Sequence, residues 1–132
     1  MKTFLTGLGF SLVLLGATPT FGQTYAEKVE LGHAIYTQHC SLCHDNSPHM
    51  LNDNGPALFG IVGRRVGFLE GYQYSPALLA AKVRQDTWTS ERLDKFLTNP
   101  SVMYPGTSMA MNYDDPQVRN AIITYLKTLK PR

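Results

Sequence analysis

The chain contains two cysteines, and both lie in the segment Cys40-Ser-Leu-Cys43-His44. Two thiols separated by two residues can add across the two vinyl groups on one edge of a porphyrin, because one turn of chain spans that edge. The next residue, His44, is then placed beneath the ring with its imidazole directed at the iron. The spacing therefore predicts covalent attachment of one haem c through Cys40 and Cys43, with His44 as an iron ligand.

Three other interpretations of the cysteine pair stay open at this level. A redox-active dithiol normally lies beside a strand in a βαβ unit, a pattern that the sequence lacks. A zinc site would need further ligands, and His33, His39 and His49 are candidates, but no second Cys or His pair stands at metal-ligand spacing. A structural disulfide is the third interpretation. Because the only cysteines of the chain form this motif, we favour haem.

The second axial position of the iron decides what a haem protein does, since an open position admits substrates. A methionine thioether suits reduced iron and raises the reduction potential. Beyond the amino-terminal segment, the candidates are Met50, Met103, Met109 and Met111. Met109 is best placed, because it ends the segment Pro105-Gly-Thr-Ser-Met109, whose proline and glycine fix a loop that can direct a side chain inward. We expect Met103 and Met111 to pack instead.

Length and charge limit the classes of function. The chain has 132 residues, which fits one small domain, and its 12 basic and 10 acidic residues nearly balance. Binding of nucleic acid calls for a clustered basic surface, so we expect no nucleic-acid partner. A flat cofactor would supply much of the apolar centre that a domain of this size lacks.

The amino-terminal segment predicts export to the periplasm. Lys2 precedes a run of mostly apolar residues, and small residues follow the run, as is typical of a secretory signal peptide. The run is shorter than the ~20 residues that span a bilayer comfortably. We predict a signal peptide over residues 1–22, cleaved after residue 22 or as late as Ala26, and a mature domain over residues 23–132. Left uncleaved, the segment would act as a membrane anchor.

Helix signals recur along the mature chain, and no alternating strand pattern of any length appears. Thr24 and Glu27 have the spacing of a capping box, which opens a helix from about Ala26 into the cysteine pair. A second helix is expected from Ser75-Pro76 to Ala81. A third is expected from Thr89 to Asn99-Pro100, with Leu93, Phe96 and Leu97 directed inward. The last begins at Asp115-Pro116, and its apolar stripe consists of Val118, Ile122, Tyr125, Leu126 and Leu129. The middle of the chain is rich in glycine and punctuated by turns. The pattern predicts an all-α domain with a long Gly-rich loop.

These motifs together resemble class I cytochrome c of the soluble mitochondrial and bacterial type. The likeness runs from about Gly32 to Leu129. Its motifs, in chain order, are Gly32-x-x-x-Tyr36-x-x-x-Cys40-x-x-Cys43-His44, Gly55-Pro56-x-Leu58-x-Gly60, Gly63-Arg64, Gly71-Tyr72-x-Tyr74-Ser75, Trp88, Asn99-Pro100, Pro105-Gly106-Thr107-x-Met109 and Tyr125-Leu126. The resemblance implies the cytochrome c fold, with three main helices, short helices and the Gly-rich loop wrapped around one haem.

The resemblance also implies roles for individual residues. The second ring nitrogen of His44 would donate to the Pro56 carbonyl, which fixes the tautomer of the ring. The positions that correspond to partners of the haem propionates are Arg64, Tyr74, Trp88 and Thr107, and Thr107 would also hold the ligand loop. Gly32 and Tyr125 correspond to a close crossing of the first and last helices.

Three positions depart from the family pattern. Phe96 stands where many members have a tyrosine that bonds the ligand sulfur, and Met111 where many have an aromatic residue beside the haem edge. Ser108 stands where mitochondrial members have a lysine. The missing lysine and the near-neutral charge weaken electrostatic steering. We therefore expect a monomer whose redox partners dock on a small apolar patch at the exposed haem edge.

The function that follows is electron transfer by a periplasmic protein, not an enzyme. With His44 and Met109 on the iron, no substrate reaches it, and the haem only changes between Fe(II) and Fe(III). The main alternative is a dedicated haem subunit that stays bound to a periplasmic dehydrogenase. A less favoured alternative is a peroxidase-like haem enzyme in which Met109 is displaced.

Overall fold

The computed structural model describes residues 22–131, and the predicted signal peptide lies almost wholly outside the described residues. In chain order the elements are α1 (Tyr25–Ile35), the π-helical turn η1 (Tyr36–Cys40), α2 (Pro76–Val83), α3 (Ser90–Thr98), α4 (Pro100–Met103) and α5 (Pro116–Leu126). Among the described residues no strand forms, and a single isolated bridge pairs Arg65 with Thr87. The predicted all-α class is confirmed.

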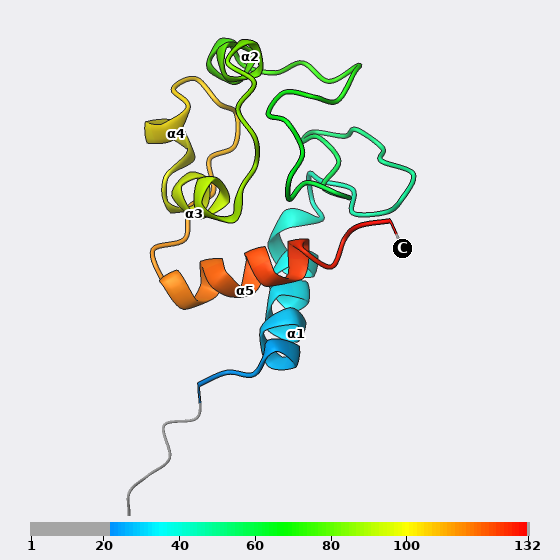
Figure 1. The fold of residues 1–132 in the computed structure, drawn as a ribbon, viewed down its shortest axis with the longest axis vertical. Coiled ribbons are helices and arrows are strands. Elements are labelled where there is room, and N and C mark those ends of the chain that lie inside the picture. The colour runs from blue at the N-terminus through cyan, green and yellow to red at the C-terminus, as the bar shows by residue number, and fades with distance from the viewer. Residues whose placement is uncertain (1–21, 132) are drawn as a thin grey trace, which may run out of the picture.

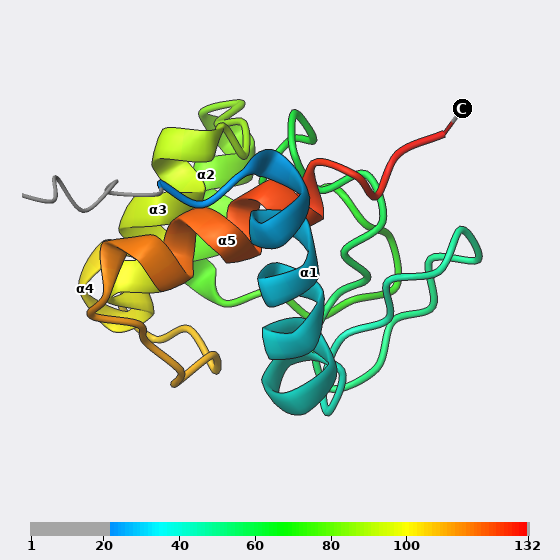
Figure 2. The same cartoon turned by 90° about the horizontal axis from the view of Figure 1, so that it is seen from below.

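Figures 1 and 2 show how the helices divide the molecule. The first and last helices, α1 and α5, cross each other. The long loop between η1 and α2 lies to one side of the crossing, and α2, α3 and α4 lie to the other. None of the helices in the described part of the chain combines the length and hydrophobicity that crossing a bilayer requires.

The first helix begins where its capping box was predicted. The Thr24 hydroxyl accepts the Glu27 N–H at 3.2 Å, and the Glu27 carboxylate accepts the Thr24 N–H at 2.7 Å. At Tyr36 the α-helix passes into the π-helical turn, in which the Tyr36 carbonyl accepts the N–H of Ser41 at 2.9 Å. The predicted helix into the cysteine pair is therefore confirmed, although its last turn is wider than an α-helical turn.

The other predicted helix starts are confirmed by their caps. Ser75 accepts the N–H of Leu78, Thr89 that of Arg92, and Asp115 that of Gln117. The short helix α4 was not predicted. Asn99 ends α3, and its side chain accepts the N–H of Val102. Pro100 occupies the first position of α4, so the Asn99-Pro100 pair both ends α3 and starts α4.

The crossing of α1 and α5 is as close as the resemblance implied. A methyl group added to Gly32 would lie 2.2 Å from the carbonyl oxygen of Ala121 and 2.6 Å from Cβ of Tyr125. The Tyr36 and Tyr125 rings pack with centroids 5.6 Å apart. Only glycine permits this approach, and the two helices together form one wall of the core.

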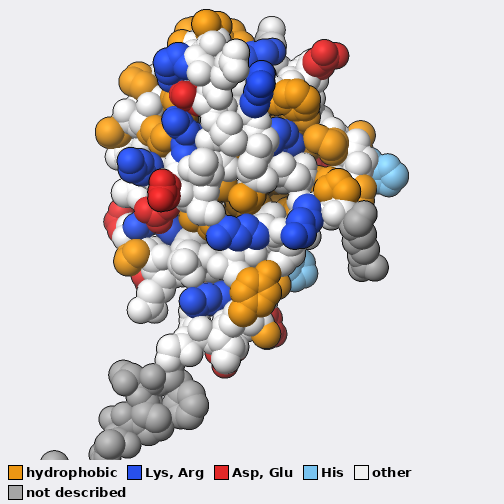
Figure 3. Space-filling model, viewed as in Figure 1, with side chains coloured by type: hydrophobic (Ala, Val, Ile, Leu, Met, Phe, Trp, Pro, Cys, Tyr) orange, Lys and Arg blue, Asp and Glu red, His pale blue; other side chains and the backbone are white. Residues whose placement is uncertain are grey.

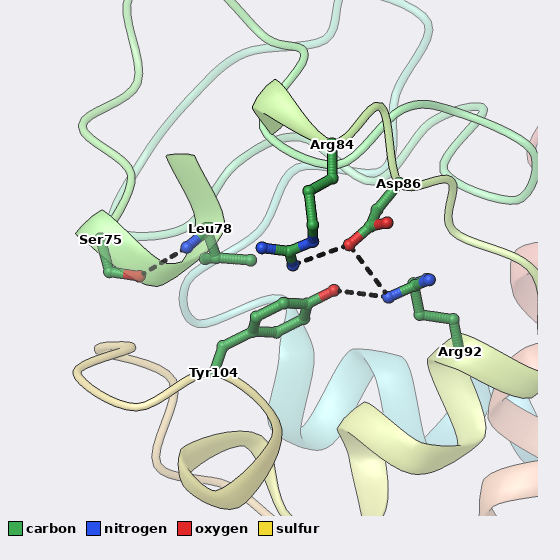
Figure 4. A network of polar contacts seen from close by, with 6 residues as sticks. All are labelled: Ser75, Leu78, Arg84, Asp86, Arg92 and Tyr104. Carbon is green, nitrogen blue, oxygen red and sulfur yellow. Dashed lines mark hydrogen bonds and ion pairs between the residues drawn. The ribbon is translucent and has the colours of Figure 1, made fainter. Parts of the chain in front are cut away.

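A polar network ties α3 to the residue that precedes the Pro105–Met109 loop (Figure 4). Asp86 accepts from Arg84 at 2.9 Å and from Arg92 at 3.3 Å, and Arg92 also donates to the Tyr104 hydroxyl at 3.0 Å. The Tyr104 ring packs on Trp88 and Phe96, with centroids 5.9 and 5.8 Å away. Tyr104, just before that loop, is thus held by ring packing on Trp88 and Phe96 and by the hydrogen bond from Arg92.

Candidate haem-binding site

The predicted site residues surround a cavity of about 360 Å³. Those that line it are Cys40, Cys43, His44, Pro56, Arg64, Tyr74, Trp88, Thr107 and Met109. They come from separate parts of the chain, which the fold brings together. Much of the remaining wall is aliphatic or aromatic and includes Ile61, Leu93, Phe96 and Ile122.

The His44 ring is oriented by a single hydrogen bond. Its Nδ1 lies 2.7 Å from the Pro56 carbonyl oxygen, which only accepts, so Nδ1 carries the proton and donates. The lone pair of Nε2 is then free to bind a metal. Burial lowers the pKa of His44, and the bond to Pro56 opposes that shift. A neutral imidazole with a free Nε2 is the form that iron ligation requires.

Two residues that were given no role in ligand placement also hold His44. The Tyr36 hydroxyl donates to the His44 carbonyl at 2.5 Å, and a methyl group on Gly55 would lie 2.3 Å from Cε1 of the imidazole. The Gly55 N–H also donates to the Cys43 carbonyl at 2.7 Å. The Gly55-Pro56 motif signalled a close approach, whereas nothing in the sequence indicated the bond from Tyr36.

Met109 lines the cavity from a segment remote from the cysteine motif and is partly buried. Gly106 has φ +81° in the preceding turn, a conformation that favours glycine. The Thr107 hydroxyl accepts the Met109 N–H at 3.4 Å, a bond within the Pro105–Met109 loop. Met103 packs against the core as expected, whereas Met111 also lines the cavity and is 39% exposed.

The residues predicted to bind propionates have backbone partners in the structure. The Arg64 guanidinium donates to the carbonyls of Ala57 and Phe59, and the Tyr74 hydroxyl accepts the N–H of Leu69 at 3.3 Å. Burial lowers the pKa of Arg64 and raises that of Tyr74, and each group moderates the shift of the other. Trp88 is buried at the cavity wall. Their roles toward propionates stay a prediction.

Comparison with known proteins decides what this cavity holds. No family model matches the chain. Cytochrome c2 of Rhodopila globiformis is 40% identical to it over 105 residues, which cover 79% of this chain and 94% of that protein. Cytochrome c of Euglena viridis is 40% identical over 102 residues, 76% of this chain and 96% of that protein. The chain belongs to the cytochrome c family. Cytochrome c-550 of Ancylobacter novellus is a further relative, 37% identical over 90 residues that cover 67% of this chain and 84% of that protein.

As a class I cytochrome c, the chain carries one covalently attached haem c and serves electron transfer. This selects haem from the four interpretations of the cysteine pair. The cavity fits the group: the two cysteines and His44 lie at its wall, the wall is largely apolar, and Gly55 leaves the imidazole room to lie against the backbone.

Proposed function

We propose that this cytochrome c is an exported electron carrier whose haem is linked through Cys40 and Cys43 and ligated by His44 and Met109. The observation that carries the proposal is that Met109 and the Nδ1-bonded His44 line the same cavity from remote segments. The bound haem would supply a one-electron Fe(II)/Fe(III) couple.

The residues around the cavity suit a carrier better than an enzyme. His44 and Met109 would hold the haem iron and would leave it no position for a substrate, so we propose no catalytic activity. The apolar wall would limit the access of water, and the hydrogen bonds at His44 and Thr107 would keep the proposed ligands in place in both oxidation states. Arg64, Tyr74, Trp88 and Thr107 would hold the haem propionates.

The proposed location rests on the amino-terminal sequence. Residues 1–22 would direct export as a signal peptide. Cleavage after residue 22, or as late as Ala26, would leave residues 23–132 as the mature periplasmic domain. The relatives include bacterial and eukaryotic proteins, so kinship alone does not select the compartment. The mass of the purified mature protein tests the cleavage, since retention of the amino-terminal segment would contradict it.

Redox partners would dock at the exposed haem edge of a monomer, largely through apolar contact. Leu42, between the two cysteines, is 71% exposed, and Met111 is 39% exposed at the cavity wall. Lys and Arg side chains are spread over the face shown in Figure 3 and interspersed with apolar groups. Over the whole chain, however, the 12 basic and 10 acidic residues nearly balance, so we expect weak steering and association rates that depend little on ionic strength.

Replacement of the distal ligand is the direct test. We expect Met109→Ala to abolish the weak red absorption band of the methionine–iron bond in the oxidised protein and to lower the reduction potential, since methionine ligation raises it. Met103→Ala, at a methionine outside the cavity wall, is the matched control and should keep the band. Retention of both band and potential in Met109→Ala would contradict Met109 as ligand.

The other functions predict different results. A pyridine haemochrome spectrum reports whether the haem is linked by two thioethers. Rapid binding of cyanide or peroxide by the untreated protein would favour a peroxidase-like enzyme with Met109 displaced. Stable co-purification with a dehydrogenase would favour a dedicated haem subunit over a diffusible carrier.

A further inference from the structure

Tyr113 contributes a buried hydroxyl to the cavity, and none of the roles above uses it. The residue lines the cavity wall, and its oxygen is sealed from solvent without a formed hydrogen bond. Buried polar atoms in native proteins almost always have a partner, so an exception calls for an explanation. Burial, together with the neighbouring Cys40 thiol, raises the pKa of Tyr113 to about 12, so the hydroxyl keeps its proton at neutral pH.

The backbone of Tyr113 is held on both sides, and its ring packs against a neighbour of Cys40. Its N–H donates to the Leu97 carbonyl at 2.8 Å, and its own carbonyl accepts from Arg119 at 2.9 Å. Arg119 is itself anchored to Asp94 on α3 at 2.7 Å. The ring packs edge-on against His39, with centroids 6.3 Å apart. Tyr113 and Cys40 line the same cavity, and the hydroxyl and the thiol are near enough for each to shift the pKa of the other.

Attachment of haem changes what Cys40 can offer to this hydroxyl. A thiol both donates and accepts hydrogen bonds, whereas a thioether sulfur keeps only its lone pairs. Once Cys40 is a thioether, the two groups can pair in one way only, with Tyr113 as the donor. Cys43 is exposed, and the structure pairs no such hydroxyl with it.

We propose that Tyr113 donates a hydrogen bond to the thioether sulfur at Cys40 and thereby raises the reduction potential of the haem. This inference rests on the proposed attachment of haem through Cys40. A donor at the sulfur draws electron density from the edge of the ring system, which stabilises the state that holds the extra electron. Tyr113 is thus a residue that tunes the haem without ligating the iron.

The haem-loaded protein allows two independent measurements. In the wild type, the carbon–sulfur stretching bands of the resonance Raman spectrum should shift when the hydroxyl is exchanged in deuterated water. Tyr113→Phe keeps the ring and removes the hydroxyl, so the isotope shift should disappear. The oxidised-to-reduced ratio at a fixed ambient potential should rise about threefold, because only the part of the hydrogen-bond free energy that differs between the two oxidation states is lost. Tyr25→Phe, at a 65% exposed tyrosine of α1, is the matched control and should change neither.

The outcomes separate this inference from the proposed function. Mass spectrometry of the haem peptide first establishes whether Cys40 carries a thioether, and its absence there would overturn the attachment and this inference together. With the thioether present, a wild-type spectrum that is insensitive to deuterium would overturn the role of Tyr113 alone. So would a Tyr113→Phe protein with an unchanged potential. The isotope measurement needs no variant, so it decides the matter even if Tyr113→Phe fails to fold.

Discussion

At the scale of single residues, His44 is oriented by three contacts within its own chain. Pro56 fixes the tautomer, the Tyr36 hydroxyl holds the His44 carbonyl, and Gly55 lies against the ring. Each contact restricts a different motion of the residue. As the proposed ligand, His44 would therefore lose its ordering entropy on folding and not on ligation, which would favour the same geometry in both oxidation states.

Gly55→Ala should displace the His44 ring. Its new methyl group would meet the imidazole at 2.3 Å, and we expect a loss of about 1–3 kcal/mol in the free energy of unfolding. The absorption spectrum of the haem should change as well, because the added methyl group clashes with His44, the proposed iron ligand. Chemical denaturation and the visible spectrum measure the two effects.

Gly71→Ala is the matched control for this change. Gly71 has φ +75°, and nothing lies within 4 Å of an added methyl group. It should cost about 1–2 kcal/mol of backbone strain and leave the haem spectrum unchanged. Equal spectra for both variants would contradict the role given to Gly55.

The residues that could be predicted from the sequence are those whose chemistry depends on local spacing. The Cys40–His44 motif and the loop that carries Met109 are of this kind, and both line the cavity. Tyr36 bonds the His44 carbonyl, and Tyr113 lies near Cys40, contacts that only the folded chain makes. A tyrosine in a sequence has no local signal that distinguishes such a contact from ordinary packing.

At the scale of elements, caps account for most of what was predicted correctly. Ser75, Thr89 and Asp115 each start a helix because a side-chain oxygen satisfies an N–H of the first turn, which needs no tertiary context. The π-helical turn and α4 were missed for the opposite reason. The π-helical turn directly follows α1, and α4 begins one residue after α3. Packing against the rest of the fold decides whether a helix continues, changes to a wider turn or ends and begins again at such a position.

The capping box of α1 should make stability depend on pH. Hydrogen bonds from the backbone and side chain of Thr24 lower the pKa of Glu27 below its ordinary value. The ionised carboxylate therefore stabilises the fold above that ordinary value, and the contribution is lost as pH falls through the lowered pKa. We expect Glu27→Gln to be less stable than the wild type at neutral pH and equally stable in acid.

Denaturation curves at several pH values measure this difference. Glu30→Gln removes the same charge from the same helix, and no capping contact forms at Glu30, so it is the control. A stability gap for Glu27→Gln that stays constant down to acid pH would contradict the assignment.

At the scale of the whole molecule, the crossing of α1 and α5 packs the first helix of the described chain against the last. Gly32→Ala tests how much this close contact matters, because two effects of opposite sign compete. Alanine favours an isolated helix by about 1 kcal/mol over glycine. Its methyl group, however, would lie 2.2 Å from the Ala121 carbonyl oxygen, which is backbone and cannot move alone.

The clash should win at this crossing. We expect Gly32→Ala to lower the free energy of unfolding by about 2 kcal/mol, with little change in the spectrum of any folded haem protein. Thermal or chemical unfolding gives the sign directly. A more stable variant would mean that helix propensity governs α1 and that the contact with α5 is dispensable.

The same crossing joins the earliest and the latest helices of the described chain to be synthesised. Until α5 has been made, the face of α1 around Gly32 has nothing to cover it. A chain in which α5 has not yet docked on α1 would present Cys40 and Cys43 on an incomplete scaffold, open to attachment of the haem. Docking of α5 completes that wall of the core, so attachment would fall before the fold closes.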